Sequence, residues 1–482
     1  MPWLTLSFDF DLGLFGLDPR AFYWHQLLVL WIAACATYAL LRLWADPLWS
    51  GLGAALFVGG APAAMVAQQL SARHYLEGLV FAILALYLYV RGLRQDRPIL
   101  FWCGGVLYGL AITAKEVFVP LVMVLPFQPE RDARRRWRAA LPYLVVALAY
   151  VPWRWYMLGT PIGGYGHQIV WRAVLEMPLA IGGSLLGRGT VGMAAGLLAL
   201  AAFVLALRRG RRTLLLGGAI IAAIVTPLVP VATSIQSEHR YLLLGWWAFC
   251  CVIALAVQQV AGLGRVGLVA ALGVCSFLLG AALYQGWVEK RGLAHWIEEV
   301  ETQGRFVWDA DAHQVLVCTP PFAGILGYGR GLLWIRERAR ASPQVPRLVV
   351  DEIELAQMDT GRMRVWAYAE PCRCMRDISG NVPRILAEWE ARRVVKPLSV
   401  AIRYARNVIA WQLGPYEYGT YSVIDSQSIG KVKLPTTGQE RLALPASSYD
   451  FYIRYDSPDG WITYSPTLKF PAGSGGLLVW QR

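Results

Sequence analysis

The chain has 482 residues, of which 56% are hydrophobic and 16% are charged, with a formal charge of +13. A soluble globular protein carries about 25% charged residues, so this composition excludes an ordinary soluble enzyme and predicts a polytopic membrane protein. The basic residues occur in short runs between apolar segments, where they report the orientation of membrane spans. This distribution argues against nucleic acid as a partner.

Ten apolar segments are predicted to cross the membrane, because a helix needs roughly 20 apolar residues to span a bilayer. The segment 117–127 is short and contains two prolines. It is counted as a separate pass because only then do the arginine runs at 91–97, 131–138 and 208–212 fall on one side, which the positive-inside rule makes cytoplasmic. The ten segments are 26–43, 48–67, 75–92, 98–114, 117–127, 139–158, 190–207, 213–233, 241–260 and 266–284.

This orientation predicts that residues 1–25, the turn at Lys115 and Glu116, and the chain after residue 284 lie outside the cytoplasm. No signal peptide or earlier span in the sequence carries residues 1–25 across the membrane. We therefore expect that a first span and loop precede this sequence, in preference to an N-terminus that crosses unaided. The other predicted outer loops are 68–74, 159–189 and 234–240.

Residues 285–482 contain no apolar run of span length and predict two extracytoplasmic modules. The segment 286–303 has the pattern of an amphipathic helix that leaves the membrane. Strands and helices then alternate, which predicts a small α/β module over 285–397. From residue 398 short strands and turns predominate, and Ser-Pro-Asp-Gly at 457–460 is a hairpin signal. Residues 398–482 therefore predict a β-sandwich-like module.

Three weaker signals in this part stay open. Asp309, Asp311 and His313 could hold a divalent metal, although three polar residues in a loop more often form a solvated turn. Cys372 and Cys374 form a C-x-C pattern, for which a structural role is favoured over metal binding or redox chemistry. Aromatic residues of the β-rich module could stack on sugars, although at alternating spacing they more often form core and cross-strand pairs. These aromatic residues are Trp411, Tyr416, Tyr418, Tyr452, Tyr455, Trp461 and Tyr464.

Charged residues also gather at the predicted outer ends of the spans. Such charges often only anchor helix ends at the interface, and this interpretation is favoured for Arg154. A sharper hypothesis is that Arg73, Lys115 and Arg240 converge on one cavity open to the outside, where they bind a lipid phosphate. Glu116 and Glu238 would keep these cations oriented in the empty site. The remaining charged or titratable residues at the outer face are Asp9, Asp11, Asp18, His74, Glu77 and His239.

The same segments resemble the C-type (GT-C) integral-membrane glycosyltransferases, which take a sugar from a polyprenyl-phosphate donor on the outer membrane face. Among these, the sequence is most similar to the transmembrane and tetratricopeptide-repeat O-mannosyltransferases and their bacterial relatives. The resemblance covers about residues 1–260 and follows four motifs in the family's order: "LSFDFDLGLF", "ARHYLEG", "TAKEVFVP" and "SEHRYLLL". Members usually carry an essential acidic residue in a loop before the first motif, and that loop is not within this sequence. The tail here is β-rich instead of tetratricopeptide repeats.

The resemblance implies a glycosyltransferase reaction with inversion at the anomeric carbon. A carboxylate would deprotonate the acceptor hydroxyl, and basic side chains would stabilise the leaving lipid phosphate. The resemblance assigns the role of base to Asp9 or Asp11. It assigns phosphate binding to Arg73, Lys115 and Arg240, and a supporting role to Glu116, Glu238 and His239.

The implied partners are a polyprenyl-phosphate sugar lipid and the membrane, expected to be a bacterial inner membrane with the C-terminal part outside the cytoplasm. No cofactor is firmly implied, and a divalent metal stays open. The alternative is a non-catalytic relative that binds a polyprenyl lipid or assembles surface polysaccharide. A transporter is disfavoured because the charges lie at span ends and not at broken helices in mid-membrane. The sugar, the acceptor and the oligomeric state stay open.

Overall fold

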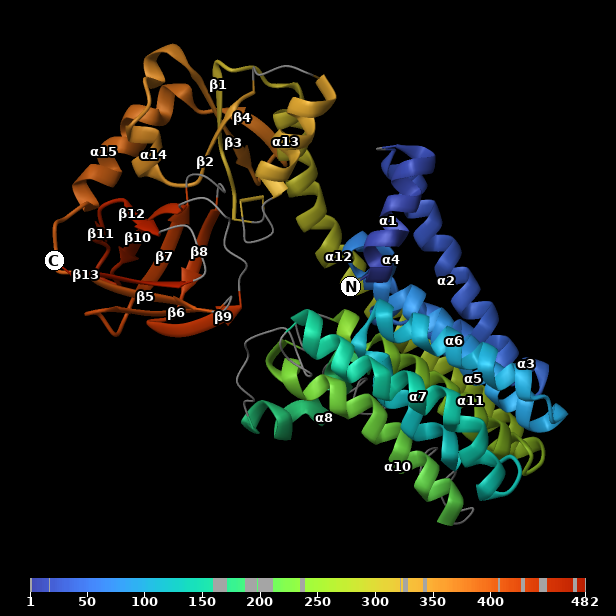
Figure 1. Cartoon of the computed structure of the whole chain (residues 1–482). Helices are drawn as coiled ribbons and strands as arrows, with labels where there is room; N and C mark the ends of the chain where they lie inside the picture. The colour runs from blue at the N-terminus through green and yellow to red at the C-terminus, as the bar shows by residue number, and fades with distance from the viewer. Residues whose placement is uncertain are drawn as a thin grey trace. The chain divides into compact units, whose positions relative to one another are not determined.

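The computed structural model of the chain divides into two compact units, Met1–Gly292 and Leu293–Arg482 (Figure 1). The first unit is helical, and the second contains the β-sheets. The residues that the structure describes are 2–16, 18–158, 171–186, 197, 211–234, 239–320, 322–323, 328–340, 345–405, 408–425, 430–441, 449–470 and 475–481.

Helices α1 and α2 show how the sequence sets helix boundaries in the first unit. Gly16 has a φ of 60° after the last turn of α1, and Asp18 accepts a hydrogen bond from the N–H of Arg20 at 3.0 Å. Asp18 thus caps α2, which begins with proline, a residue suited to the first helical position. The helices of this unit are α1 (Pro2–Phe15), α2 (Pro19–Leu41), α3 (Pro47–Gly59), α4 (Ala61–Gln68), η1 (Leu70–Ala72), α5 (Arg73–Gln95), α6 (Pro98–Ala114), η2 (Glu116–Phe127), α7 (Ala133–Leu158), α8 (Trp171–Leu186), α10 (Arg211–Val225), η3 (Thr226–Ser234), η4 (His239–Leu242), α11 (Leu243–Ala261) and α12 (Arg265–Asp309), where η marks 3-10 segments.

Five helical segments among the described residues are long and apolar enough to cross a membrane, or six if α3 and α4, bent by 56°, count as one span. The prediction of apolar helices long enough to span a membrane is therefore confirmed, while the predicted number of ten is not reached within the described part of the chain. The predicted span 190–207 lies outside the described residues except for residue 197. The five segments are Pro19–Leu41, Leu70–Gln95, Leu215–Ala232, His239–Ala261 and Arg265–Asp309.

Two predicted segments adopt a different structure. Residues 1–25, expected to be an outer loop, form α1 and the first part of α2 because Trp3, Ser7 and Asp11 recur at helical spacing on one face. The predicted pass 117–127 is the 3-10 helix η2, which has 12 residues. Its two prolines lack the N–H groups that an α-helix needs, so the tighter helix replaces it.

Helices α5 and α6 form an antiparallel hairpin and lie side by side (Figure 1). Small residues allow neighbouring helices to approach closely. A Cβ added to Gly104 of α6 would lie 1.8 Å from the hydroxyl of Tyr143 in α7, and this hydroxyl donates to the carbonyl of Ala85 in α5 at 2.9 Å. The hairpin returns the chain, so Arg73 at the start of α5 and Lys115 after α6 lie at the same end of the helical unit.

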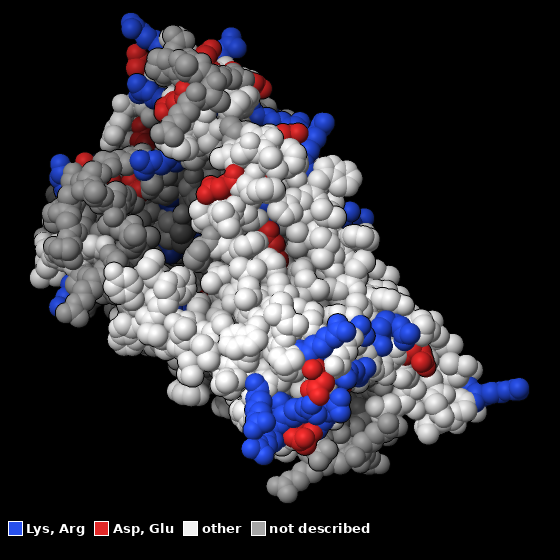
Figure 2. Space-filling model, turned by 45° about the vertical axis from the view of Figure 1, so that its right-hand side comes forward, with Lys and Arg blue, Asp and Glu red and all other residues white. Residues whose placement is uncertain are grey.

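The opposite end carries the arginine-rich loops. Figure 2 shows Lys and Arg gathered there with Asp and Glu among them, below a largely uncharged surface. Arg94 pairs with Glu130 at 3.0 Å. Arg136 is buried and donates to the carbonyls of Pro126 at 2.8 Å and Arg131 at 2.7 Å. These arginines are bound to loop carbonyls and carboxylates, which is a structural role.

The bend between α3 and α4 is stabilised from α11. A Cβ added to Gly60 would lie 2.2 Å from the ring of Trp246. The indole N–H of Trp246 donates to the carbonyl of Phe57, the last turn of α3, at 2.9 Å. Glycine at the bend therefore lets the indole reach a carbonyl near the break.

The second unit begins with a four-stranded α/β sheet in the order β2-β1-β3-β4, in which β1 is parallel to β2 and β3, and β4 is antiparallel to β3. Val315, Leu316, Val349 and Val365 are buried in it. Its elements are β1 (Gln314–Val317), α13 (Tyr328–Arg340), β2 (Arg347–Val349), α14 (Glu352–Ala356), β3 (Arg364–Ala369), β4 (Cys374–Asp377) and α15 (Val382–Arg392).

Two antiparallel sheets follow and share one hydrophobic core, so the β-rich part is sandwich-like as predicted. One sheet has the order β13-β5-β6-β9 and the other β11-β10-β7-β8, with β12 also paired to β10. The core takes Val400 and Ile402 from the first sheet and Phe451 and Ile453 from the second. The strands are β5 (Ser399–Ala405), β6 (Val408–Gly414), β7 (Thr420–Asp425), β8 (Gly430–Leu434), β9 (Thr437–Arg441), β10 (Tyr449–Asp456), β11 (Ile462–Tyr464), β12 (Leu468–Phe470) and β13 (Gly475–Gln481).

A buried ionic cluster joins the α/β sheet to the sandwich. Asp351, the N-cap of α14, accepts hydrogen bonds from Lys431 at 2.9 Å, Arg454 at 2.6 Å and Tyr464 at 2.8 Å. Burial alone would raise the pKa of Asp351, but Lys431 and Arg454 outweigh burial and hold the pKa below its ordinary value. We call these residues the Asp351 cluster.

Candidate functional site

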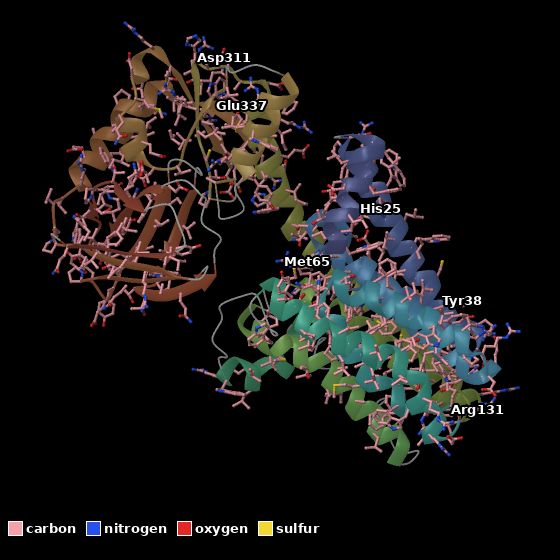
Figure 3. The ribbon with its side chains drawn as sticks, viewed as in Figure 1. His25, Tyr38, Met65, Arg131, Asp311 and Glu337 are labelled. Carbon is pink, nitrogen blue, oxygen red and sulfur yellow. A yellow bond between two sulfur atoms is a disulfide. The ribbon has the colours of Figure 1, made fainter. Side chains whose placement is uncertain are left out.

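The three predicted phosphate-binding cations lie at one end of the helical unit. Arg73 opens α5, the Nζ of Lys115 lies 5.2 Å from the centre of the Tyr75 ring, and Arg240 is close enough to interact electrostatically with Lys115. Figure 3 shows His25, in the first turns of α2, and Arg131, in the arginine-rich loops, at opposite ends of this unit. Segments distant along the chain thus meet at the end opposite those loops.

Lys115 lies in a buried group of charges. Its side chain is 2% exposed, and its Nζ lies 3.5 Å from an oxygen of Glu116. The other oxygen of Glu116 lies 3.7 Å from Arg154, which is buried and donates to the hydroxyl of Tyr150 at 3.0 Å. Glu116 therefore bridges two cations, as expected for a group that orients them. Arg154, interpreted from sequence as a boundary anchor, belongs to this site instead.

His74 is buried near Lys115 and Arg240. The residue is 6% exposed, and its imidazole interacts electrostatically with Lys115 and Arg240. The backbone of Ser71 is the nearest hydrogen-bonding group to the ring, and neither ring nitrogen contacts another side chain of the described residues by a hydrogen bond. A buried polar group normally has a partner. One ring nitrogen of His74 is therefore left to bond a ligand beside two cations.

Arg73 has a different environment from the one expected of a phosphate ligand. It is fully buried and forms an ion pair with Asp11. It also donates to the carbonyl of Phe22 at 2.8 Å and to the side chain of Gln26 at 3.3 Å, and its guanidinium lies 4.6 Å from the ring of Phe8. Through these contacts Arg73 holds α1 and α2 against α5.

Asp11, the ion-pair partner of Arg73, is likewise buried and hydrogen-bonded. It is 1% exposed and accepts hydrogen bonds from Arg73 and from Nδ1 of His25, the latter at 2.8 Å. Glu77, one turn beyond Arg73, accepts from Ser7 at 2.6 Å and from the indole of Trp3 at 3.0 Å. We call Ser7, Asp11, His25, Arg73 and Glu77 the Arg73 cluster.

The other predicted residues fall into three cases. Asp9 is exposed, because two residues along an α-helix turn the side chain roughly 200° away from Asp11. His239 is buried, and its Nδ1 lies 3.1 Å from an oxygen of Glu289 in α12. Glu238 lies outside the described residues.

The weaker signals of the second unit have structural explanations. Within the described residues no three His, Cys, Asp or Glu side chains are grouped to hold a metal ion, and Asp311 accepts a hydrogen bond from the N–H of His313 at 2.8 Å, which forms a turn. Cys372 and Cys374 form a disulfide. Tyr416 stacks on Tyr455 at 4.5 Å and meets Trp461 edge-on at 5.3 Å, so these three rings pack against each other, whereas Tyr418 is exposed.

Sequence inspection missed His25, whose partner Asp11 lies on another helix. No local motif joins the two residues, so only the packing of α1 against α2 could have revealed the pair. Arg154 carried a usable signal, since Tyr150 stands one turn earlier on the same helix face.

No protein-family model matches the chain, and neither does any curated protein. The chemistry of the site must therefore be inferred from its own residues. Two cations, an orienting carboxylate and a buried imidazole suit an anion with several acceptor oxygens, such as a phosphate.

Proposed function

We propose that this protein is a membrane glycosyltransferase that uses a polyprenyl-phosphate-linked sugar on the extracytoplasmic face. The observation that supports the proposal most directly is the meeting of Lys115, Arg240 and His74 at the end of the helical unit opposite the arginine-rich loops. On this proposal the chain is a GT-C-like protein, and the spans expected from sequence extend beyond those described.

The orientation of the site follows from charge and redox arguments. Arginine-rich loops favour the cytoplasmic side of a membrane, so the Lys115 end would be extracytoplasmic. Disulfides persist mainly in oxidising compartments, and the Cys372–Cys374 bond supports the same side for the second unit.

Lys115 and Arg240 would bind the phosphate of the donor, and His74 would donate one hydrogen bond to a phosphate oxygen. These groups stabilise the negative charge that grows on the phosphate as the bond to the sugar breaks. A buried site strengthens this effect because little water screens the charges. Arg73 is excluded from this role because it is bound to Asp11.

A second candidate function is a non-catalytic protein that binds a polyprenyl lipid. The pairing of Asp11 with Arg73 favours it, because a carboxylate held by an arginine is a poor base for an acceptor hydroxyl. Both candidates share the phosphate site and differ in whether a sugar is transferred.

The test uses the full-length protein in lipid nanodiscs with a synthetic short-chain polyprenyl-phosphate mannose. We expect Arg240→Ala and Lys115→Ala each to weaken donor binding at least tenfold and to lower transfer about 10²–10³-fold. Arg135→Ala, at the opposite end, should leave both unchanged. Unchanged binding in the first two variants contradicts the phosphate site, whereas wild-type binding without transfer favours the second candidate.

A further inference from the structure

His25 is the exposed member of the Arg73 cluster. Its side chain is 26% exposed, whereas those of Asp11 and Arg73 are 1% and 0% exposed. An acceptor molecule could therefore reach the imidazole and could not reach the carboxylate behind it.

The hydrogen bonds of His25 determine which nitrogen carries the proton. Nδ1 lies 2.8 Å from an oxygen of Asp11 and 3.3 Å from Nη1 of Arg73. A carboxylate can only accept, so the shorter contact assigns the N–H to Nδ1 and leaves a lone pair on Nε2. Asp11 thus sets the tautomer that a base requires.

Two carboxyl groups and one guanidinium surround His25. The groups that face it are Asp11 from α1 and Arg73 and Glu77 from α5, and Nε2 lies 3.7 Å from an oxygen of Glu77. Glu77 accepts two hydrogen bonds, from Ser7 and Trp3.

The Arg73 cluster adjoins the phosphate site. Arg73 and His74 are consecutive at the start of α5, so the groups around His25 and around Lys115 share the first turn of one helix. A base at His25 and a phosphate at Lys115 would therefore flank a substrate at the same end of the helical unit.

We propose that His25 is the general base of the transfer reaction and that Asp11 is a positioning residue, an inference that rests on the proposed glycosyltransferase function. The acceptor O–H bond breaks and its proton moves to Nε2 of His25. The acceptor oxygen bonds to the anomeric carbon as the bond from that carbon to the phosphate oxygen breaks. The electron pair of that bond stays on the phosphate, beside Lys115 and Arg240.

The experiment measures donor binding, transfer rate and pH profile in nanodiscs, with short-chain polyprenyl-phosphate mannose as donor and water or octyl mannoside as acceptor. We expect His25→Gln to lower kcat about 10²–10⁴-fold with donor binding within twofold of wild type. The fall in rate at acidic pH, where a base is protonated, should disappear from its residual activity. His313→Gln, an exposed histidine of the second unit, should keep the wild-type rate and profile.

Two outcomes would overturn the proposal separately from the proposed function. Transfer by His25→Gln at the wild-type rate and with the wild-type pH profile removes the base but keeps the glycosyltransferase. Wild-type protein that binds the donor without any transfer removes both. His25→Gln could lose donor binding because it misfolds. In that case His25→Gly is assayed with added imidazole. Recovery of transfer supports His25 as the base, and no recovery overturns this role.

Discussion

The two units of this protein each bury an arginine against carboxylates, and the clusters differ in one respect. In the second unit Arg454 is bound to Asp351 and to Asp456, at 2.6 and 2.7 Å, and these contacts join two sheets. In the first unit Arg73 is bound to Asp11, which also contacts a partly exposed histidine. The partly exposed group beside Asp351 is Lys431, an ammonium that only donates, whereas the one beside Asp11 is His25, an imidazole that can both donate and accept.

Removal of Arg73 is expected to have the largest effect on stability. Arg73→Met leaves Asp11 and Glu77 buried without their cation, which should cost about 3–5 kcal/mol. Unfolding of the full-length protein in detergent, followed by intrinsic fluorescence, should show a midpoint lower by roughly 10 °C. The double variant Arg73→Met/Asp11→Asn should recover part of the loss, and an unchanged midpoint in Arg73→Met would remove the structural role of the pair.

Loss of the carboxylate in the second unit should have a smaller effect. Asp351→Asn leaves Arg454 bound to Asp456, so we expect a loss of about 2 kcal/mol. Thermal unfolding monitored by circular dichroism measures this change. Asp377→Asn, at an exposed residue, is the matched control, and an equal loss in both variants would contradict the importance of burial.

The stability of the second unit should also depend on pH through Asp351. The pKa of this carboxyl is lowered on folding, so its contribution is present above the unfolded value of about 3.9 and is lost as the pH falls through the folded value. We expect the denaturant midpoint to fall below about pH 4. In Asp351→Asn this dependence should weaken, and an unaltered dependence would assign it to other carboxyls.

Removal of one hydroxyl from each cluster should have the smallest effect on stability, and it compares the Arg73 cluster directly with the Asp351 cluster. Ser7→Ala removes a donor to Glu77, and Tyr464→Phe removes a donor to Asp351. Each should cost about 1 kcal/mol. Only Ser7→Ala should shift the pH profile of transfer, because Glu77 faces His25. A shift in Tyr464→Phe as well would show that the profile reports global stability.

The apolar segments and the strand-and-turn pattern predicted the membrane helices and the sandwich because both follow from local periodicity. Residues 98–114 coincide with α6, and the hairpin at 457–460 joins β10 to β11, which are antiparallel. The 3-10 form of η2 was harder to predict, because an apolar run containing prolines can be read as a short span.

The candidate site was predictable only in part. The positions of Arg73, Lys115 and Arg240 at span ends predicted that they lie at one end of the helical unit, because each antiparallel helix pair returns the chain to the end where it began. These positions could not predict that Arg73 is bound to Asp11, because that contact depends on how α1 packs against α5. The exposure of Asp9 and the burial of Asp11 likewise required the helical phase of α1.

The glycine at the bend between α3 and α4 has a consequence for motion in the bundle. Straightening the break would withdraw the Phe57 carbonyl from the Trp246 indole and leave the buried indole N–H without its acceptor, at a cost of about 1–3 kcal/mol. We therefore expect the bend between α3 and α4 to resist straightening, so that larger movements within the helical unit involve other helices.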